Sequence, residues 1–559
     1  MMQKTLQEIQ YAVSIGFEHR QLAVSEHIAL GTSLARISPD AIPGYMRKIK
    51  AAFLSSFTVQ GLPEVFRAAS LFNNVWADTY NAPYNQFTQE ILNTESALYH
   101  FDPTLCFLLL DTKDIADGAH LETLIDTLLA KTKATIVIFN FISDVNSSSG
   151  AATALNKKIN TLSEQGTRIF VYDFNSFLAR NGKDAIWNTK YAALGDLRIH
   201  PDAFPRLAYD ISRFAVAATG ATKKCVILDG DDTLWKGIVG EDGTLAIVPN
   251  ITLQQLLLEL SKKGTLLALN SKNNFDDVVE VLERHPDMLL HKSDFANLKI
   301  NWDSKDSNIT AIARELRLGT DSFVFVDDSP FEREIVRTSL PEVAVIAPED
   351  LAMYPGFHTF GVTAEDTRRG EMYTEEIKRK ELESSTASVD DFIRKLGLEV
   401  AIAPAIQETI PRISQLTQKT NQFNMTTRRY TDVDIISKLA QGWNIWSVSA
   451  HDRFGEYGII GVCMVEPLAD VWRIDNLLLS CRILGRKVED IVMVYLCNEA
   501  EKRGIKKITG DFIPTQKNAP AASFFSSAGF RLVGKEGANE AYEYTPVQKQ
   551  SYPNFIKVL

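Results

Sequence analysis

Two aspartates one residue apart follow a short apolar run and make this the part of the sequence best suited to chemistry. Asp229 and Asp231 come directly after residues 225–228, which are all apolar. A buried strand of this kind ends in a tight turn, where the two carboxylates can share one Mg²⁺. Asp229 can then attack phosphorus and form an aspartyl-phosphate, while Asp231 protonates the leaving oxygen and later activates water. The alternative is an Asp-rich turn that caps a helix.

Three further segments supply the other groups that phosphoryl transfer requires. One apolar run leads to Ser271, whose hydroxyl can bind a phosphate oxygen. Lys305 offers a positive charge for the phosphoryl group in the transition state. Another apolar run ends in Asp327 and Asp328, which complete the oxygen ligands of the metal. Strands that alternate with helical segments predict a parallel sheet, whose carboxyl ends bring these residues into one crevice.

These four motifs, in this order, resemble the haloacid dehalogenase superfamily of phosphohydrolases. The resemblance implies that Asp229 is the nucleophile, Asp231 the acid/base, and Ser271 and Lys305 the phosphate holders, with Thr233 bracing the turn. It implies Mg²⁺ as the cofactor, bound by Asp229, Asp231, Asp327 and Asp328. The gaps between the motifs leave no room for a separate cap domain. The predicted site is therefore open and suits a large substrate or a partner domain that closes over it.

Length and composition indicate a folded protein of several domains. The chain has 559 residues, 45% of them hydrophobic and 23% charged. Its net charge of −11 argues against general nucleic-acid binding. Five widely spaced cysteines form no CxxC pair, which fits a reducing cytosol. No segment reaches the ~18 apolar residues of a membrane span, and the amino terminus has no signal-like apolar region, so we expect a cytoplasmic protein without membrane contact.

The first predicted domain, residues 1–218, alternates apolar strands with helical segments and is typical of a doubly wound α/β fold. One strand end faintly resembles the SGNH esterases, with Ser56 in the nucleophile position, Asn140 in a later block and His200 as a possible base. The usual Gly-Asp before the serine is missing, and Asp196 lies four residues before His200 where the family pattern has three. We therefore expect a degenerate domain that serves positioning or partner binding.

Three further regions follow along the chain. Residues 219–350 form the predicted phosphatase domain, a capless Rossmann-like parallel sheet. Residues 351–388 are highly charged and predict an exposed helical linker, with Thr363 as its N-cap and Asp366 at capping-box spacing. Residues 389–559 predict an α+β domain with several strands and a long helix.

The strand, loop and helix that begin near residue 472 resemble the GNAT acyltransferase fold, in which loop N–H groups at a helix N-terminus hold the pyrophosphate of coenzyme A. The loop partly fits the R-x-x-G-x-G/A pattern from Arg482, with Lys487 in place of the last small residue. Cys481 is expected at the N-terminal edge of the helix, where the dipole and nearby cations favour a thiolate. That thiolate could carry an acyl thioester, whereas the alternative is a small buried hydrophobe.

The whole combination closely resembles the FkbH-like glyceryl transferases/phosphatases of polyketide and related pathways, whose longer members carry an SGNH-like domain in front. The resemblance rests on the stretch 228–243, on residues 422–430 and on the loop around Cys481. It implies that D-1,3-bisphosphoglycerate loses phosphate and passes its glyceryl group through Cys481 to the phosphopantetheine thiol of an acyl carrier protein. Further candidates for binding phosphate or pantetheine, unless they pair on the surface, are Thr427, Arg428, Arg482 and Lys517.

Some features leave alternatives open. Gly230 and Asp232 replace the Leu and Asn of the family's D-L-D-N-T, although both lie between the reactive positions. His451 is either a base for Cys481 or a surface residue. Residues 473–517 hold nine Lys/Arg against six Asp/Glu, which favours docking of an acidic carrier protein. The other two functions are a Mg²⁺ phosphatase with an accessory GNAT-like domain, and a coenzyme-A-dependent acyltransferase, which Lys487 disfavours.

Overall fold

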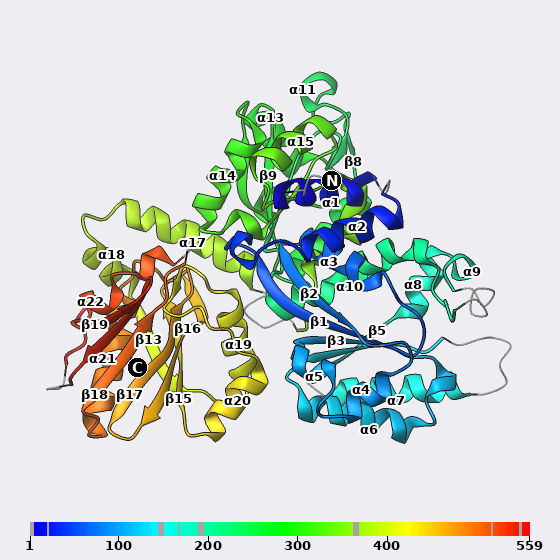
Figure 1. Ribbon diagram of the computed structural model, residues 1–559. Coiled ribbons are helices and arrows are strands. Elements are labelled where there is room, and N and C mark those ends of the chain that lie inside the picture. The colour runs from blue at the N-terminus through cyan, green and yellow to red at the C-terminus, as the bar shows by residue number, and fades with distance from the viewer. Residues whose placement is uncertain are drawn as a thin grey trace.

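The computed structural model of the protein contains three large sheets, each with its own helices (Figure 1). It describes residues 5–19, 22–142, 150–165, 168–187, 195–361, 368–515, 518–546 and 550–559. The predicted site residue Lys517 and the predicted capping residues Thr363 and Asp366 lie outside these ranges. Among the helices described, none has both the length and the apolar character that crossing a membrane requires.

The first sheet is parallel throughout, with strand order β2-β1-β3-β4-β5, as expected for a doubly wound α/β fold. Its strands are β1 (Arg47–Ser55), β2 (Val75–Asn81), β3 (Leu105–Leu109), β4 (Thr135–Phe139) and β5 (Ile169–Tyr172). Successive residues of β1 point to opposite faces and are buried on both, because α3 (Leu62–Leu71) and α10 (Phe204–Thr219) cover one face while α6 (Gly118–Lys131) and α7 (Ala151–Gln165) cover the other.

The second sheet is also parallel, with β6 in the centre of the order β10-β9-β6-β11-β12. Its strands are β6 (Cys225–Leu228), β9 (Leu266–Ser271), β10 (Phe295–Ile300), β11 (Phe323–Val326) and β12 (Ala344–Ile346). The helices between them are α12 (Ile251–Lys262), α13 (Phe275–Arg284), α14 (Lys305–Leu316) and α15 (Pro330–Ser339). The first helices of the chain, α1 (Leu6–His19) and α2 (Val24–Leu34), share a hydrophobic cluster with this sheet rather than forming an independent unit.

The third sheet is mixed and mostly antiparallel, with nine strands and the order β19-β20-β18-β17-β16-β15-β13-β21, while β14 pairs with β17. Its strands are β13 (Glu399–Pro404), β14 (Phe423–Asn424), β15 (Asn444–Asp452), β16 (Gly455–Leu468), β17 (Val471–Leu479), β18 (Lys507–Phe512), β19 (Arg531–Glu536), β20 (Asn539–Tyr544) and β21 (Lys557–Val558). The parallel neighbours β17 and β18 stop pairing at Ile474 and Gly510, although β17 runs on to Leu479. They therefore part before the loop that carries Cys481.

The helix α17 (Arg369–Ser384) lies between the second and third sheets and precedes α18 (Val389–Leu396) (Figure 1). Lys380 Nζ donates to the carbonyl of Glu315 at 2.6 Å, and Arg379 donates to both carboxylate oxygens of Asp452 at 2.7 and 2.9 Å. Arg379 is only 1% exposed. The predicted linker helix thus joins the two domains, but it is buried along one side instead of exposed, because its basic residues find acceptors on both neighbours.

Candidate functional site

The predicted phosphatase residues meet at the carboxyl edge of the second sheet. Asp229 follows β6, Asp327 follows β11, and Ser271 is the last residue of β9. Lys305 is the first residue of α14 and lies beside them, with its Nζ atom 2.6 Å from Asp229 Oδ1 and 3.3 Å from Asp327 Oδ2. Parallel strands end at one edge, so residues nearly 100 positions apart in the sequence converge here.

Three carboxylates at this edge form a cluster suited to a divalent cation. Asp229, Asp327 and Asp328 each offer an oxygen, and these oxygens lie within 4.8 Å of one another. Asp327 is fully buried, and its Oδ2 atom accepts no hydrogen bond from the described residues. Burial, reinforced by the nearby Asp229 carboxylate, raises the pKa of Asp327 to about 7. A bound cation would satisfy this oxygen and favour the ionised carboxylate, so the residues present fit the expected Mg²⁺.

Asp231 lies outside this cluster of three and has its own set of donors. Its Oδ1 atom accepts from the Trp235 indole at 2.9 Å and from the Val239 amide at 3.2 Å, and its Oδ2 atom accepts from the Asn273 side chain at 2.9 Å. Burial raises the pKa of Asp231, which favours the protonated form that a general acid needs. Its expected part in metal binding stays a prediction.

Thr233 and Asn273 form hydrogen bonds with two aspartates of this site, Asp328 and Asp231. The Thr233 hydroxyl accepts from the Asp328 amide at 3.1 Å and is completely buried, so it braces the turn as expected. Asn273 was not singled out from the sequence as a site residue. The signal available was its position two residues after Ser271, where a side chain at the same strand end reaches Asp231.

Ser271 is 1% exposed and lies against the backbone of Gly230. A Cβ atom at position 230 would come within 2.9 Å of Ser271 Oγ and 3.0 Å of the Trp235 ring. Gly230, which stands where the family pattern has Leu, therefore packs closely against these two side chains. A larger residue would not fit while they stay in place.

Cys481 occupies the carboxyl end of β17, and this corrects the expectation that it begins a helix. The helix α21 (Val488–Lys502) starts seven residues later. The intervening loop contains Gly485 with φ of 80° and Lys487 with φ of 57°, and these left-handed residues prevent an earlier start. Cys481 is therefore not at the N-terminal edge of this helix, contrary to the prediction.

The cations of this loop are held by the helices that cross it. Arg486 is 3% exposed and donates to both carboxylate oxygens of Glu376, on α17, at 2.8 and 2.9 Å. Lys487 forms an ion pair with Asp390 at 2.7 Å. The loop is thus anchored by α17 and α18, and two of the cations expected to favour a Cys481 thiolate already have carboxylate partners.

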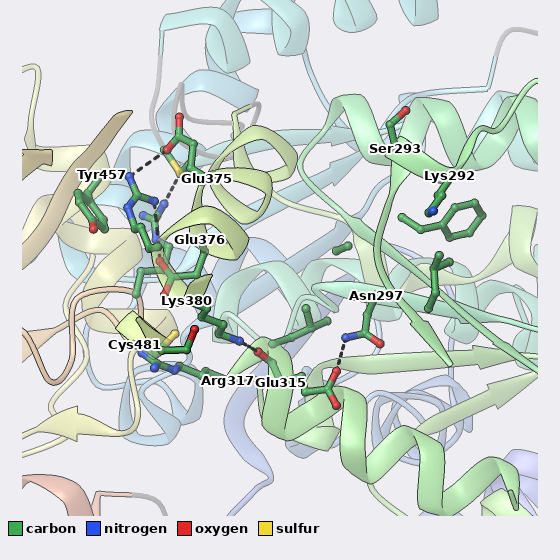
Figure 2. A pocket seen from close by; sticks show the side chains of 18 of the residues that line it. Lys292, Ser293, Asn297, Glu315, Arg317, Glu375, Glu376, Lys380, Tyr457 and Cys481 are labelled. Carbon is green, nitrogen blue, oxygen red and sulfur yellow. Dashed lines mark hydrogen bonds and ion pairs between the residues drawn. The ribbon is translucent and has the colours of Figure 1, made fainter. Parts of the chain in front are cut away.

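Cys481 is partly exposed, whereas the other four cysteines are buried. It lines two cavities, which share only Cys481, Arg482 and Arg317 among the described lining residues. The larger, about 1140 Å³, extends along α17 and the strand β10. The smaller, about 390 Å³, lies where all three domains meet. Figure 2 shows Cys481 beside Arg317, which reaches toward it from the second domain. The thiol is therefore accessible from two sides.

The two candidate nucleophiles lie near opposite ends of the strands of the second sheet. Lys224, just before β6, lines the smaller cavity at Cys481, whereas Asp229, just after β6, belongs to the carboxylate cluster. The helix α14 gives the same picture, because Lys305 begins it and Arg317 caps its other end. Twelve helical residues span about 18 Å.

The remaining candidates of the third domain have local partners. Arg428 forms an ion pair with Asp475, and Thr427 donates its amide to Asn424 Oδ1 at 2.8 Å. His451 has its Nε2 atom 3.3 Å from Glu399 and does not line either cavity at Cys481. The binding roles of Thr427 and Arg428 stay predictions, and His451 lies where its alternative as a surface residue places it.

The SGNH-like residues of the first domain have several hydrogen-bond partners in the described part of the chain. Asp196 accepts from Arg198 Nε at 2.8 Å, and His200 accepts the Asp202 amide at 3.3 Å through its Nδ1 atom. Ser56 is 1% exposed, and its hydroxyl accepts the Asp111 amide at 2.9 Å. Asn140 Nδ2 donates to Asp173 at 2.9 Å. The expectation of a degenerate site stays a prediction.

Comparisons with known proteins show a similarity to a solved structure that contains a phosphatase domain. No protein-family model matches the chain, and no curated protein matches it. The chain is similar to the crystal structure of the N-terminal part of the protein BF1531 from Bacteroides fragilis, which contains a phosphatase domain and is complexed with Mg. The identity is 26%, the match covers 60% of this chain and 96% of that one, and the TM-score is 0.51.

Acetyltransferases also match part of the chain. The ribosomal-protein-S18-alanine N-acetyltransferase from Escherichia coli matches with 12% identity over 28% of this chain and 97% of its own, at a TM-score of 0.22. A GNAT superfamily phosphinothricin acetyltransferase from Sinorhizobium meliloti, in complex with AcCoA, matches with 11% identity over 26% and 88%, at 0.21. The likeness to BF1531 and the carboxylate cluster support an enzyme with a phosphatase-like domain, whereas the GNAT-like fold of the third domain stays a prediction.

Proposed function

We propose that this protein transfers a glyceryl group from D-1,3-bisphosphoglycerate, with dephosphorylation, through a Cys481 thioester to the phosphopantetheine thiol of an acyl carrier protein. The observation that carries the proposal is the presence, in one chain, of a phosphatase-type carboxylate cluster and a separate accessible thiol between two cavities. The substrate has two reactive groups that match these sites: an acyl phosphate for the thiol and a phosphate ester for the aspartate.

The phosphatase half-reaction uses the residues at the carboxyl edge of the second sheet. An oxygen of Asp229 attacks the phosphorus of the phosphate ester. The bond from phosphorus to the ester oxygen of the glyceryl group breaks, and Asp231 donates its proton to that oxygen. Water then attacks the aspartyl-phosphate and releases phosphate. Lys305 and Ser271 hold the phosphoryl oxygens, and Mg²⁺ on Asp229, Asp327 and Asp328 would neutralise charge on the transferring group.

The transfer half-reaction uses Cys481. Its thiolate attacks the carbonyl carbon of the acyl phosphate, the bond from that carbon to the phosphate oxygen breaks, and phosphate leaves with the electron pair. The pantetheine thiolate next attacks the thioester carbonyl, and Cys481 leaves as a thiolate. Each step forms and breaks one bond at the same carbon, so no oxidant or reductant is needed.

Intact-mass spectrometry of a holo carrier protein, incubated with the enzyme and 1,3-bisphosphoglycerate, tests the proposal. We expect the carrier to gain a glyceryl group, and the wild-type enzyme to show a glyceryl adduct that hydroxylamine removes. Cys481→Ala should show neither, while Cys497→Ala, a control at a buried cysteine, should keep both. A Cys481→Ala enzyme that loads the carrier at the normal rate would exclude the covalent relay.

A coenzyme-A-dependent acyltransferase is the weaker reading of the third domain. Lys487 replaces the small residue of the coenzyme A loop pattern, and Arg486 and Lys487 are paired with Glu376 and Asp390, so these two cations are not free to bind a pyrophosphate. A plain phosphatase with an accessory domain stays the second candidate. It predicts Mg²⁺-dependent phosphate release that Cys481→Ala leaves unchanged, with no adduct on any cysteine.

A further inference from the structure

The smaller cavity at Cys481 is formed by all three domains. Tyr45 and Arg47 come from the first, Lys224 and Arg317 from the second, and Arg412 from the third. Its volume of about 390 Å³ suits a small molecule, since ligand cavities begin near ~300 Å³. The catalytic carboxylates of the phosphatase site do not line it, so it is a separate site.

Its lining is strongly cationic in a chain with a net charge of −11. The residues that line it include one carboxylate, Asp321, and six basic residues, which are Arg47, Lys224, Arg317, Arg412, Lys419 and Arg482. Arg429 lies close behind them and donates to backbone carbonyls at Gln418 and Thr420. Burial, reinforced by the neighbouring charge of Arg47, lowers the pKa of Arg429 to about 9. Such a concentration of one charge in a cavity attracts anions.

The lining of the cavity also includes a buried polar side chain that lacks a hydrogen-bond partner among the described residues. Asn73 is fully buried, lines the cavity, and finds no hydrogen-bond partner for either polar atom of its side chain among the described residues. A buried amide without partners is unfavourable, so a ligand that offers oxygen atoms would recover a donor contact here. This observation is independent of the charge count and points to the same kind of ligand.

We propose that this cavity binds the phosphate-bearing end of a small phosphorylated carboxylic acid and presents its acyl carbon to Cys481. Arg317 is the principal contact, because it lies beside Cys481 and lines both cavities there. A longer thiol substrate enters from the other side, through the cavity of about 1140 Å³. The identity of the acid rests on the proposed function, whereas the anion site itself does not.

The test uses Cys481 as a local reporter. The full-length protein is treated with iodoacetate or iodoacetamide in EDTA, and alkylation of the Cys481 peptide is followed by mass spectrometry. Both reagents react with the thiolate, so the ratio of their rates cancels the thiolate fraction and reports the local charge. We expect this ratio to exceed that of glutathione by about tenfold, and to fall at high salt. Inorganic phosphate and 3-phosphoglycerate should each slow the iodoacetate reaction.

Two variants and a matched control separate binding from folding. Arg317→Gln should lower the rate ratio at least threefold, and Asn73→Asp, which adds a carboxylate without changing size, should abolish phosphate protection. Arg314→Gln removes an exposed arginine from the same helix, outside both cavities, and should leave the ratio unchanged. Circular dichroism and melting temperature establish that each variant is folded.

The possible results decide the proposal. A ratio equal to that of glutathione, no protection by phosphate, or equal losses in Arg314→Gln and Arg317→Gln would each overturn the anion site. Protection by coenzyme A at concentrations where 3-phosphoglycerate has no effect would assign the cavity to the phosphopantetheine arm and overturn its assignment to the donor. The alkylation test measures no turnover. A high ratio of the iodoacetate rate to the iodoacetamide rate, found together with no glyceryl transfer, would therefore refute the proposed function but not the anion site.

Discussion

Mixing Asp229→Asn with Cys481→Ala should restore the complete proposed reaction, although each variant lacks one nucleophile. The reason is that the two nucleophiles lie at opposite ends of the strands of one sheet. Residues 224 and 229 bracket the four residues of β6, and the five residue steps between them span about 16 Å. An acyl group on Cys481 places its ester phosphorus five bonds from Sγ, at most about 7 Å away with bonds of about 1.5 Å. The phosphate ester of a Cys481-bound intermediate therefore cannot reach Asp229 in the same molecule.

Whatever the order of the steps, the intermediate must then travel between the sites on the carrier protein or free in solution. Asp229→Asn should load a phosphoglyceryl group onto the carrier and stop, and Cys481→Ala should leave the carrier unloaded. An equimolar mixture should form glyceryl carrier protein at a rate within a few-fold of wild type, as measured by intact mass over time. A mixture that makes no more product than the separate variants would show that one molecule channels its intermediate, and would refute this reasoning.

Three further outcomes are expected. Asp229→Asn should keep its melting temperature but lose Mg²⁺-dependent phosphate release, because an amide forms no aspartyl-phosphate; undiminished release in a colorimetric phosphate assay would contradict the site. Ser56→Ala should load the carrier within a few-fold of wild type, and a folded variant that fails to load would reveal a working nucleophile in the first domain. Arg379→Met should destabilise the third domain by about 3–5 kcal/mol in urea unfolding, because it leaves Asp452 buried without its cation. Burial alone would raise the pKa of Asp452, but the hydrogen bonds from Arg379 and Tyr457 outweigh burial and lower this pKa. The ionised carboxylate therefore stabilises the folded domain at pH values above the usual pKa of Asp, and this stabilisation is lost as pH falls through the lowered pKa.

The phosphatase site was predictable because its signal is local. Each group follows an apolar strand, and parallel topology places all such ends at one edge, so Asp229, Ser271 and Asp327 were brought together as expected. The sequence could not show that Lys305 already contacts two of the carboxylates, or that Asn273 holds Asp231, because those contacts depend on side-chain packing across strands.

The surroundings of Cys481 were less predictable for two reasons. The expected helix start failed because Gly485 and Lys487 adopt left-handed conformations, which delay α21. The cationic cavity has no local signature at all. Its residues, from Tyr45 to Arg482, come from three domains and meet only when these dock, and docking leaves no periodic pattern in a sequence.

The buried side of α17 bears on where the third domain could be cut out and fused to another chain. A fragment cut at 389, where the sequence places the start of the last domain, would lose Arg379 and Glu376 together. Asp452 would lose its cation, and Arg486 would lose the carboxylate that anchors the loop of Cys481. The portable unit therefore begins at 368 or earlier. Since Lys380 also donates to the Glu315 carbonyl of the second domain, a host chain would need to offer an equivalent acceptor for the graft to hold its cysteine in place.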